Sequence, residues 1–299
     1  MNRAALGGFA VDLGGTKTAA ARIENGQIAA RRQAATDGAA GLDAMLDHVA
    51  DLLAGLGYSP GAPLGVAVTG RIGSDGRWQA VNQGTLSAID GVPLKVALDT
   101  RFGNAAVGND AALAAVAEAH FGAGRASRCF AYLTVSTGVG GGLVLDGRPV
   151  LSPNGLAGHV GFVTSPLGSA RCGSGRLGTV ESVAGGRAIA KAAADAGHPD
   201  TDARTVFSEA LAGAEWAERI VDRSAAAIAT LCADLTAILG LDRVALGGSI
   251  GLAPGYLDRV ERHLAQEPAL FRVPLGPAEL GQDSALLGAL ALHHMKGTT

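Results

Sequence analysis

One pattern occurs twice in this chain and restricts its fold more than any other feature. Residues 9–33 contain three short runs, FAVDL, TAAARI and QIAARRQ, separated by a GGT turn and an Asn-Gly pair. Short apolar runs divided by glycine turns, with Asn-Gly among them, are typical of β-hairpins. Residues 129–151 repeat this layout with a Ser-Thr-Gly-rich turn and an Asp-Gly pair. The repetition predicts two α/β lobes, each beginning with a hairpin around a glycine turn.

Other apolar patterns predict helices and further strands. Apolar residues from Leu42 to Leu56 recur at helical spacing, which indicates a helix with one buried face. The run LGVAVTG at 64–70 indicates a buried strand. These later segments match the duplication only in outline. The remaining expected elements are helices at 93–103, 109–122, 181–196, 215–240 and 255–266, and a strand at 243–247.

The two predicted lobes follow one another without a flexible connector. A chain of 299 residues has room for two domains of ordinary size. Since no Pro-rich or Ser-rich linker occurs, we expect closely joined lobes that meet near residues 111–125. We assign 1–115 to an N-terminal lobe and 116–283 to a C-terminal lobe, and we expect a last helix, about 284–296, to pack back on the first lobe.

Composition excludes several classes of protein. Apolar residues make up 48% of the chain, which predicts a large core rather than disorder. The formal net charge of −3 provides no basic surface for nucleic acid or for an anionic membrane. The most apolar stretch, 224–241, contains Asp234, which favours a buried helix over a membrane span. The first residues lack the apolar run of a signal peptide, and three widely spaced cysteines fit a reducing cytoplasm.

The first glycine turn, in DLGGTKT at 12–18, carries groups that can bind phosphate and metal. Its backbone N–H groups can face outward, and a hydroxyl and a cation follow, a combination that can hold a phosphate. The carboxylate at the strand end can hold Mg²⁺ directly or through water. The spacing is not that of a P-loop, and an ordinary hairpin turn would explain the same glycines. The candidate ATP-binding residues in this turn are Asp12, Gly14, Gly15, Thr16 and Lys17.

Two further glycine turns strengthen this interpretation. STGVGGG at 136–142 occupies the place in the second lobe that GGTK occupies in the first. Together, two such turns can hold the β- and γ-phosphates of ATP from both sides of a cleft. The turn LGGS at 246–249 can lie flat against a base or ribose, and a plain βα turn is an equal alternative. The candidates in these turns are Thr137, Gly138, Gly140, Gly141, Gly247 and Gly248.

Asp110, beside Asn109 at a predicted helix start, is the main candidate for a catalytic group. The helix dipole and free N–H groups stabilise an ionised carboxylate. Such a carboxylate can orient a sugar hydroxyl and accept its proton during phosphoryl transfer. The competing interpretation is a simple N-cap pair. Gly70 and Arg71 follow a buried strand end, where α/β proteins bind ligands, although Arg71 as a solvated turn residue is the alternative.

Together these motifs resemble the ROK (repressor, open reading frame, kinase) family of sugar kinases. DLGGTK, NDA before a helix, TGVGGG, LAGHVG and GGS occur in the family's order over nearly the whole chain. The resemblance implies an α/β, actin-like (hexokinase-type) ATPase fold with two lobes, each a mixed sheet with helices, and a cleft between them. It also implies ATP and Mg²⁺ as cofactors and Asp110 as the catalytic base. The sugar contacts that it implies are Gly70, Arg71, Asn82, Asn109, Asp110, His159 and Glu181.

Within the family, VSTGVGGG, GLAGHVG, GGSIGLAPGYL and LAQEPALF resemble the bacterial N-acetylmannosamine kinases. This resemblance implies phosphorylation of N-acetylmannosamine to its 6-phosphate, a reaction of sialic acid catabolism. Glucokinase-like members carry Glu where this chain has His159, whose neutral imidazole can bind sugar hydroxyls without adding a carboxylate beside Asp110. Glucose or another N-acetylhexosamine is the alternative substrate. The family also implies a cytoplasmic homodimer.

Two alternatives come from other classes of protein. A DNA-binding repressor of the family would carry an N-terminal helix-turn-helix, which we do not expect because Asp12 is already part of the first motif. A catalytically inactive, sugar-sensing regulator is the second alternative, and the retained Asp12, Asp110 and both glycine turns argue against it. We therefore expect a sugar and ATP as partners, without nucleic acid or membrane.

The glycine-rich loop at 159–181 first suggests a metal site. The family binds a structural zinc ion with one His and three Cys, the latter in C-x-C-G-x-x-G-C-x-E. By this resemblance Phe162 stands at the His position, Ala170 and Thr179 stand at two Cys positions, and Cys172 is kept. Structural zinc needs four N or S ligands. We therefore expect no structural zinc, and we expect packing that involves Phe162 to hold the loop.

Overall fold

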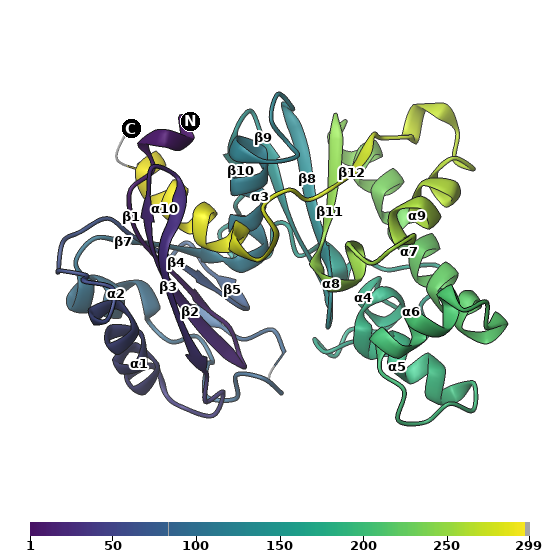
Figure 1. Cartoon of the computed structure of the whole chain (residues 1–299), viewed down its shortest axis with the longest axis horizontal. Helices are drawn as coiled ribbons and strands as arrows, with labels where there is room; N and C mark the ends of the chain where they lie inside the picture. Colours follow the sequence, from purple (N-terminus) through teal and green to yellow (C-terminus); the bar gives the residue numbers. More distant parts are fainter. Residues whose placement is uncertain (83, 297–299) are drawn as a thin grey trace. The chain divides into compact units, whose positions relative to one another are not determined.

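The computed structural model describes residues 1–82 and 84–296, which form two compact units (Figure 1). The first unit comprises Met1–Gly122, Gly147–Ala157 and the C-terminal residues from Gln282, and the second comprises Ala123–Asp146 and Gly158–Gly281. No helix among the residues described combines the length and the apolar character that a membrane crossing needs.

The segment Gly147–Ala157 groups with the first unit, although the sequence boundaries assigned it to the C-terminal lobe. A ring nitrogen of His120 is hydrogen-bonded to the carbonyl of Gly147 at 2.8 Å, and the N–H of Ser74 donates to the carbonyl of Pro153 at 2.9 Å. These bonds tie the segment to residues much earlier in the chain. No local sequence signal marks such a return, so a boundary drawn as a single cut misses it.

The first unit is built on a five-stranded sheet with the order β3-β2-β1-β4-β7. Strand β1 pairs antiparallel with β2, which pairs antiparallel with β3, whereas β1–β4 and β4–β7 are parallel. Asn25 and Gly26 both have positive φ, 51° and 71°, as a type I′ hairpin turn requires, and the predicted hairpin is confirmed. The strands are β1 (Gly8–Leu13), β2 (Lys17–Glu24), β3 (Gln27–Ala35), β4 (Leu64–Val68) and β7 (Ala105–Asn109).

Helices cover both faces of this sheet. Helices α1 (Leu42–Ala54) and α2 (Leu94–Phe102) share one core with alternate residues of β1 and β4. On the other face, α10 (Ser284–Lys296) packs against α3 (Asp110–Phe121) and β4. A side chain at Gly65 would overlap the backbone of α10, so this glycine permits the helix to lie close to the sheet.

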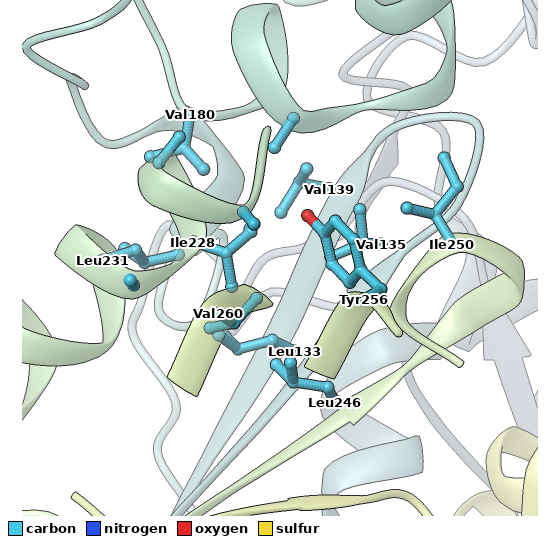
Figure 2. Packing of buried hydrophobic residues seen from close by; sticks show 14 of the residues in the cluster. Leu133, Val135, Val139, Val180, Ile228, Leu231, Leu246, Ile250, Tyr256 and Val260 are labelled. Carbon is cyan, nitrogen blue, oxygen red and sulfur yellow. The ribbon is translucent and has the colours of Figure 1, made fainter. Parts of the chain in front are cut away.

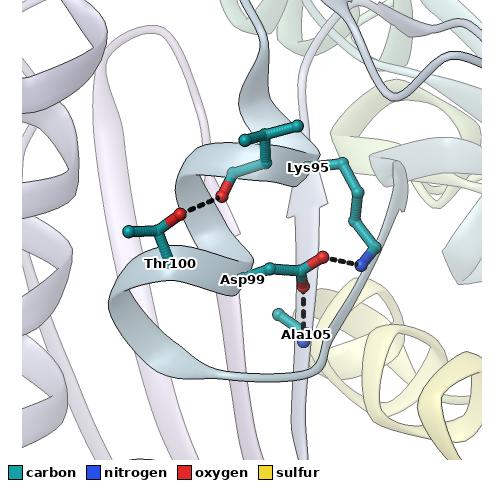
Figure 3. Close-up of polar contacts among 5 residues, drawn as sticks. Lys95, Asp99, Thr100 and Ala105 are labelled. Atoms are coloured by element: carbon teal, nitrogen blue, oxygen red, sulfur yellow. Dashed lines mark hydrogen bonds and ion pairs between the residues drawn. The ribbon is translucent and has the colours of Figure 1, made fainter.

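Asp99 connects α2 to the strand that leads to the candidate site (Figure 3). Its carboxylate accepts a hydrogen bond from the N–H of Ala105, the first residue of β7, at 3.3 Å and forms an ion pair with Lys95. The neighbouring Thr100 donates its hydroxyl to the carbonyl of Val96 at 2.9 Å within α2. Strand β7 ends at Asn109, directly before Asp110. Asp99 therefore helps to fix the strand that positions these two candidate residues.

The second unit repeats the strand order of the first. Its sheet has the order β10-β9-β8-β11-β12, in which the short edge strand β10 belongs to the segment Gly147–Ala157. The pair β8–β9 is antiparallel, and β8–β11 and β11–β12 are parallel. Asp146 and Gly147 have positive φ, 47° and 75°, and form the second tight turn. The duplication that the sequence indicated in outline therefore extends to the order of strands. The strands are β8 (Cys129–Val135), β9 (Val139–Leu145), β10 (Arg148–Pro149), β11 (Arg243–Gly247) and β12 (Leu275–Pro277).

The core of the second unit lies between this sheet and its helices (Figure 2). Leu133 and Val135 of β8 pack with Ile228, Leu231 and Tyr256 from two helices. The helices are α4 (Glu181–Ala184), α5 (Gly186–Asp195), α6 (Ala203–Leu211), α7 (Glu215–Leu239), α8 (Gly248–Gly251) and α9 (Tyr256–Leu264).

Two differences from the predicted helices affect the candidate site. The helix expected at 181–196 is interrupted at Gly185, whose extended backbone, φ −69° and ψ 153°, separates α4 from α5. Helix α6 was not predicted. A small hairpin of β5 (Arg71–Ile72) and β6 (Trp78–Gln79), also not predicted, follows β4.

Candidate active site

The carboxyl ends of three parallel strands bring the first-unit candidates together. In the register of the sheet, Leu13 lies opposite Val68, and Val68 lies opposite Asn109. The residues at the ends of β1, β4 and β7 therefore lie along one edge, the usual ligand-binding edge of such a sheet. This edge carries Asp12, Gly70, Asn109 and Asp110.

The Asp110 carboxylate is surrounded by hydrogen-bond donors. It accepts bonds from the hydroxyl of Thr69 at 3.0 Å, from the side-chain amide of Asn109 at 2.9 Å and from the N–H of Ala111 at 2.8 Å. These donors stabilise its negative charge and fix its orientation. The cap itself is Asn109, whose side-chain oxygen accepts from the N–H of Ala112 at 3.0 Å. The N-cap interpretation thus holds for Asn109, whereas Asp110 is not the cap.

Asp12 lies in a different electrostatic environment. Burial, and then the negative charge of Asp110, raise its pKa to about 7, while Lys17 and Arg31 act in the opposite direction. Two carboxylates that interact this strongly form an unfavourable pair unless a cation lies near them. Carboxylate oxygens are the ligands that Mg²⁺ prefers, with water and phosphate oxygens completing its shell. The residues present therefore fit a magnesium ion held at Asp12.

The first glycine turn packs closely against the loop that contains Asn82. The N–H of Gly14 donates to the carbonyl of Lys17 at 3.1 Å, which closes the turn. A Cβ atom at Gly15 would lie 3.0 Å from the Cβ of Thr85, so the turn and the loop are in close contact here. The backbone N–H and the hydroxyl of Thr85 both donate to the carbonyl of Asn82. The structure thus brings the Asn82 loop to the turn, while Thr16 and Lys17 remain exposed.

Arg71 is engaged in holding its own surroundings. Its guanidinium donates to the carbonyl of Asn154 at 2.6 Å and to the side-chain oxygen of Gln79. These bonds join the β5–β6 hairpin to the segment Gly147–Ala157, which gives Arg71 a structural role. The interpretation of Arg71 as a solvated turn residue is therefore wrong. Its predicted contact with a sugar stays a prediction.

In the second unit, the turn after β8 is held by Glu181. The Glu181 carboxylate accepts bonds from the N–H of Val139 at 3.2 Å and from the N–H of Gly173 at 3.3 Å. A side chain at Gly138 would overlap this carboxylate. Glu181 therefore connects the turn to the glycine-rich loop, and its role as a sugar ligand stays a prediction.

The remaining second-unit glycines divide into two groups. Gly140 and Gly141 lie within β9 rather than in the turn, and a side chain at Gly141 would approach the side chain of Val160 at 2.6 Å. Packing alone thus explains Gly141. Gly247 and Gly248 form the turn from β11 into α8, and Gly248 has a φ of +82° that favours glycine.

A cavity of about 630 Å³ opens beside these turns, within the second unit. Its volume is in the range of small-molecule sites. Ser136 and Thr137 line it from the turn after β8, and Ser249, which follows Gly248, also lines it. The rest of the lining is Gly186, Arg187, Ala190, Asp202, Ala203, Arg204, Phe207, Ser208, Leu211, Ile250, Leu252, Ala253 and Pro254.

The loop at 159–181 is held by backbone bonds and ring packing. Two isolated β-bridges, Thr164–Thr179 and Arg171–Leu177, connect its two halves. The ring of His159 stacks on that of Phe162, with centroids 6.0 Å apart and an interplanar angle of 23°. The residues at the former ligand positions do not fit zinc, since Phe, Ala and Thr offer no N or S donor. No group of three or more His, Cys, Asp or Glu side chains suited to a metal occurs within 1–82 and 84–296.

Sequence reasoning missed several residues at these sites. Thr69 precedes Gly70 at the same strand end, and its hydroxyl bonds to Asp110. The strand-end signal that pointed to Gly70 applies equally to Thr69. Arg31 acts on Asp12 from β3, and Arg187 lines the cavity from α5, and no motif indicated either residue.

Nearly the whole chain is similar to known proteins of one family. The ROK family profile matches residues 8–296. An N-acetylmannosamine kinase from Citrobacter koseri is 42% identical over 286 residues, which cover 95% of this chain and 97% of that protein. A ROK hexokinase from Thermus thermophilus is 29% identical, with a TM-score of 0.83 over 97% of this chain and 98% of the other.

A ROK family glucokinase from Streptomyces griseus, solved in complex with glucose and AMPPNP, is 24% identical, with a TM-score of 0.78 over 96% of this chain and 99% of the other. The predicted α/β, two-lobe, actin-like fold of the hexokinase type is confirmed by these relatives. Because the family match spans both units, with the glycine turns and the NDA motif in place, this chain belongs to the ROK family.

Proposed function

We propose that this chain is an ATP-dependent sugar kinase that phosphorylates N-acetylmannosamine on its 6-hydroxyl group. The observation that carries the chemistry is the Asp110 carboxylate, oriented by three donors at the strand-end edge of the first unit. The choice of sugar is supported by 42% identity, over 95% of the chain, to an N-acetylmannosamine kinase.

Asp110 acts as the base in this proposal. The sugar hydroxyl donates a hydrogen bond to the carboxylate and gives up its proton as the oxygen attacks the terminal phosphorus. Because Thr69, Asn109 and the start of α3 hold the carboxylate, little orientation is lost when the sugar binds. Asn109 also donates to the carbonyl of Gly70 at 2.8 Å, which keeps the neighbouring strand end in place.

Asp12 holds Mg²⁺, directly or through water. The bound ion neutralises charge that develops on the phosphates during transfer. Asp12 binds such an ion as a carboxylate, so loading the site displaces the proton that burial favours on it. Lys17, on the exposed side of the turn, adds a positive charge for the phosphates.

The second unit binds the nucleotide in the cavity between α5, α6 and the 249–254 segment. Thr137 and Gly138 offer their turn to the phosphates, and Gly247 and Gly248 place Ser249 at the cavity wall. In the first unit, Gly14, Gly15 and Thr16 offer the matching turn. Gly140 and Gly141 contribute through β9, which supports the turn rather than lining the cavity.

We propose His159 and Glu181 of the second unit as sugar contacts. His159 offers a ring nitrogen to a sugar hydroxyl, with Phe162 holding the ring orientation. A carboxylate has more acceptor positions than the two bonds of Glu181 use, so Glu181 can also accept from a hydroxyl. The further proposed sugar contacts are Gly70, Arg71, Asn82 and Asn109.

The finer features of the proposal rest on the family. We propose a cytoplasmic homodimer that acts in sialic acid catabolism, requires Mg²⁺, and acts without nucleic acid or membrane. Glucose or another N-acetylhexosamine is the alternative substrate. A catalytically inactive regulator is disfavoured, because Asp110 is oriented by hydrogen-bond donors and Asp12 lies near enough to interact with its charge.

A coupled assay with ATP, Mg²⁺ and a panel of hexoses tests this function. We expect the highest kcat/KM with N-acetylmannosamine and a 6-phosphate product identified by NMR. Replacing Asp110 with Asn should lower kcat by about a hundredfold to ten-thousandfold, the usual contribution of a general base. Absence of turnover with every hexose would reject the proposal, and full turnover by Asp110→Asn would reject the assigned base.

A further inference from the structure

Arg187, the second residue of α5, lies directly beside the turn that follows β8. The N–H of Gly186 donates to the carbonyl of Ser136 at 2.7 Å, and the N–H of Arg187 donates to the carbonyl of Thr137 at 3.2 Å. A Cβ atom at Gly185 would lie 3.1 Å from the Cα of Gly138, so the two backbones pack closely. The position of Arg187 is therefore fixed relative to the turn.

The guanidinium of Arg187 has no acceptor among residues 1–82 and 84–296. The residue is exposed and lines the cavity, and its side chain forms no hydrogen bond or ion pair with any residue that the structure describes. The one acid among the described lining residues, Asp202, caps α6 by accepting both the N–H and the hydroxyl of Thr205 at 2.8 Å. Arg187 thus presents a permanent positive charge to the cavity, because arginine stays protonated.

The cavity combines this charge with an apolar region. Phe207, Leu211, Leu252 and Pro254 give the lining its large apolar side chains, and Arg204 of α6 is a second cation in it. Backbone bonds hold Arg187 at the turn formed by Ser136 and Thr137. A nucleotide has the same division, since its base is flat and largely apolar and its phosphates are anionic. The phosphates therefore match the turn, and the base matches the apolar lining.

We propose that Arg187 binds the α- and β-phosphates of the nucleotide, which remain on ADP after the transfer. The inference rests on the proposed function and adds a specific ligand to it. Arg187 lines the same cavity as the apolar residues and is held at the turn after β8, where the proposed function puts the phosphates. The planar guanidinium can donate two parallel hydrogen bonds to one phosphate, which gives both affinity and orientation.

Calorimetric titration of Arg187→Ala with ADP, ATP and adenosine tests this inference. We expect the affinity for ADP to fall by about tenfold to a hundredfold, as for loss of a charge-assisted hydrogen bond. The affinity for ATP should fall by a similar factor, while adenosine binding and the KM for the sugar stay unchanged. Arg187→Lys should recover part of the loss, because it restores the charge without the planar donors.

Lys191→Ala is the matched control, since Lys191 lies one turn further along α5, is exposed, and pairs with Asp195 outside the cavity. This variant should bind ADP as the wild type does, and all variants should have equal Tm values. Unchanged ADP binding by Arg187→Ala, or equal losses for ADP and adenosine, would overturn the inference, as would wild-type protein that does not bind ADP. Wild-type protein that binds ADP but phosphorylates no sugar would overturn only the proposed function.

Discussion

The two glycine turns begin from the same sequence pattern but have different neighbours. Each connects the first two antiparallel strands of its sheet, β1 to β2 or β8 to β9. The first turn packs against the Thr85 loop and follows Asp12, a carboxyl group raised in pKa by burial and by Asp110. The second is held by Glu181 and forms one wall of a cavity. The two units thus share one scaffold, and the surrounding residues place a pair of interacting carboxylates beside one turn and a cavity beside the other.

The largest expected effect tests the electrostatics of the first turn. Between pH 4 and 7, the unfolded chain loses the Asp12 proton while the folded, metal-free protein retains it, so the free energy of unfolding falls as pH rises. About three pKa units at 1.36 kcal/mol each give a loss of up to about 4 kcal/mol. Asp12→Asn removes this contribution, so the stability of the wild type relative to Asp12→Asn should decline over this range.

Urea denaturation of both proteins at a series of pH values, in the presence of EDTA, measures this difference. All other titrating groups are present in both proteins, so their contributions cancel in the difference between the two free energies of unfolding. A difference that stays constant with pH would contradict the raised pKa of Asp12 that burial and, after it, the charge of Asp110 cause.

The next effect sharpens the contrast in how the turns are packed. Gly138→Ala places a methyl group against the Glu181 carboxylate and should break its bond to Val139, at a cost of about 1–3 kcal/mol. Gly15→Ala places a methyl group 3.0 Å from the Cβ of Thr85. A small movement of the Thr85 loop can relieve this contact, so the loss of stability should be smaller. Thermal denaturation measures both costs, and a larger loss for Gly15→Ala would reverse the comparison.

A smaller effect concerns the orientation of Asp110 in the first unit. Thr69→Val removes the hydroxyl that donates to Asp110 and should lower kcat by about tenfold. The KM for ATP should change little, because the proposed nucleotide pocket belongs to the second unit. Thr100→Val removes a comparable hydroxyl within α2 (Figure 3) and should leave kcat unchanged. Equal kcat values for all three proteins would show that Thr69 does not position Asp110.

The smallest expected effect is that of chelation on the loop at 159–181. Because backbone bridges and the His159–Phe162 stack hold this loop, EDTA should not change the Tm of protein purified without added metal. Elemental analysis of the same sample should detect less than a stoichiometric amount of zinc. One zinc ion per chain, together with a lower Tm in EDTA, would mean that the loop binds metal through ligands other than those of the family.

Much of the fold could be predicted because its signals are local. The Asn-Gly and Asp-Gly turns, the helix start at Asn109 and the apolar periodicity of α1 are encoded within a few residues, and each was found at its predicted place. The break at Gly185 was missed because it depends on the close approach of Gly138, almost fifty residues earlier. The pattern of residues 181–196 alone gives no sign of that neighbour.

The sequence by itself determined the duplicated hairpins, the family and the residues at the strand ends, since periodicity and motif order are properties of neighbouring residues. Only the tertiary structure decided that Thr69 orients Asp110, that Glu181 holds the second turn, and that Arg187 lines a cavity. These contacts join segments far apart in the chain. Their strength depends on burial and on the approach of atoms to within about 3 Å, which no spacing in the sequence expresses.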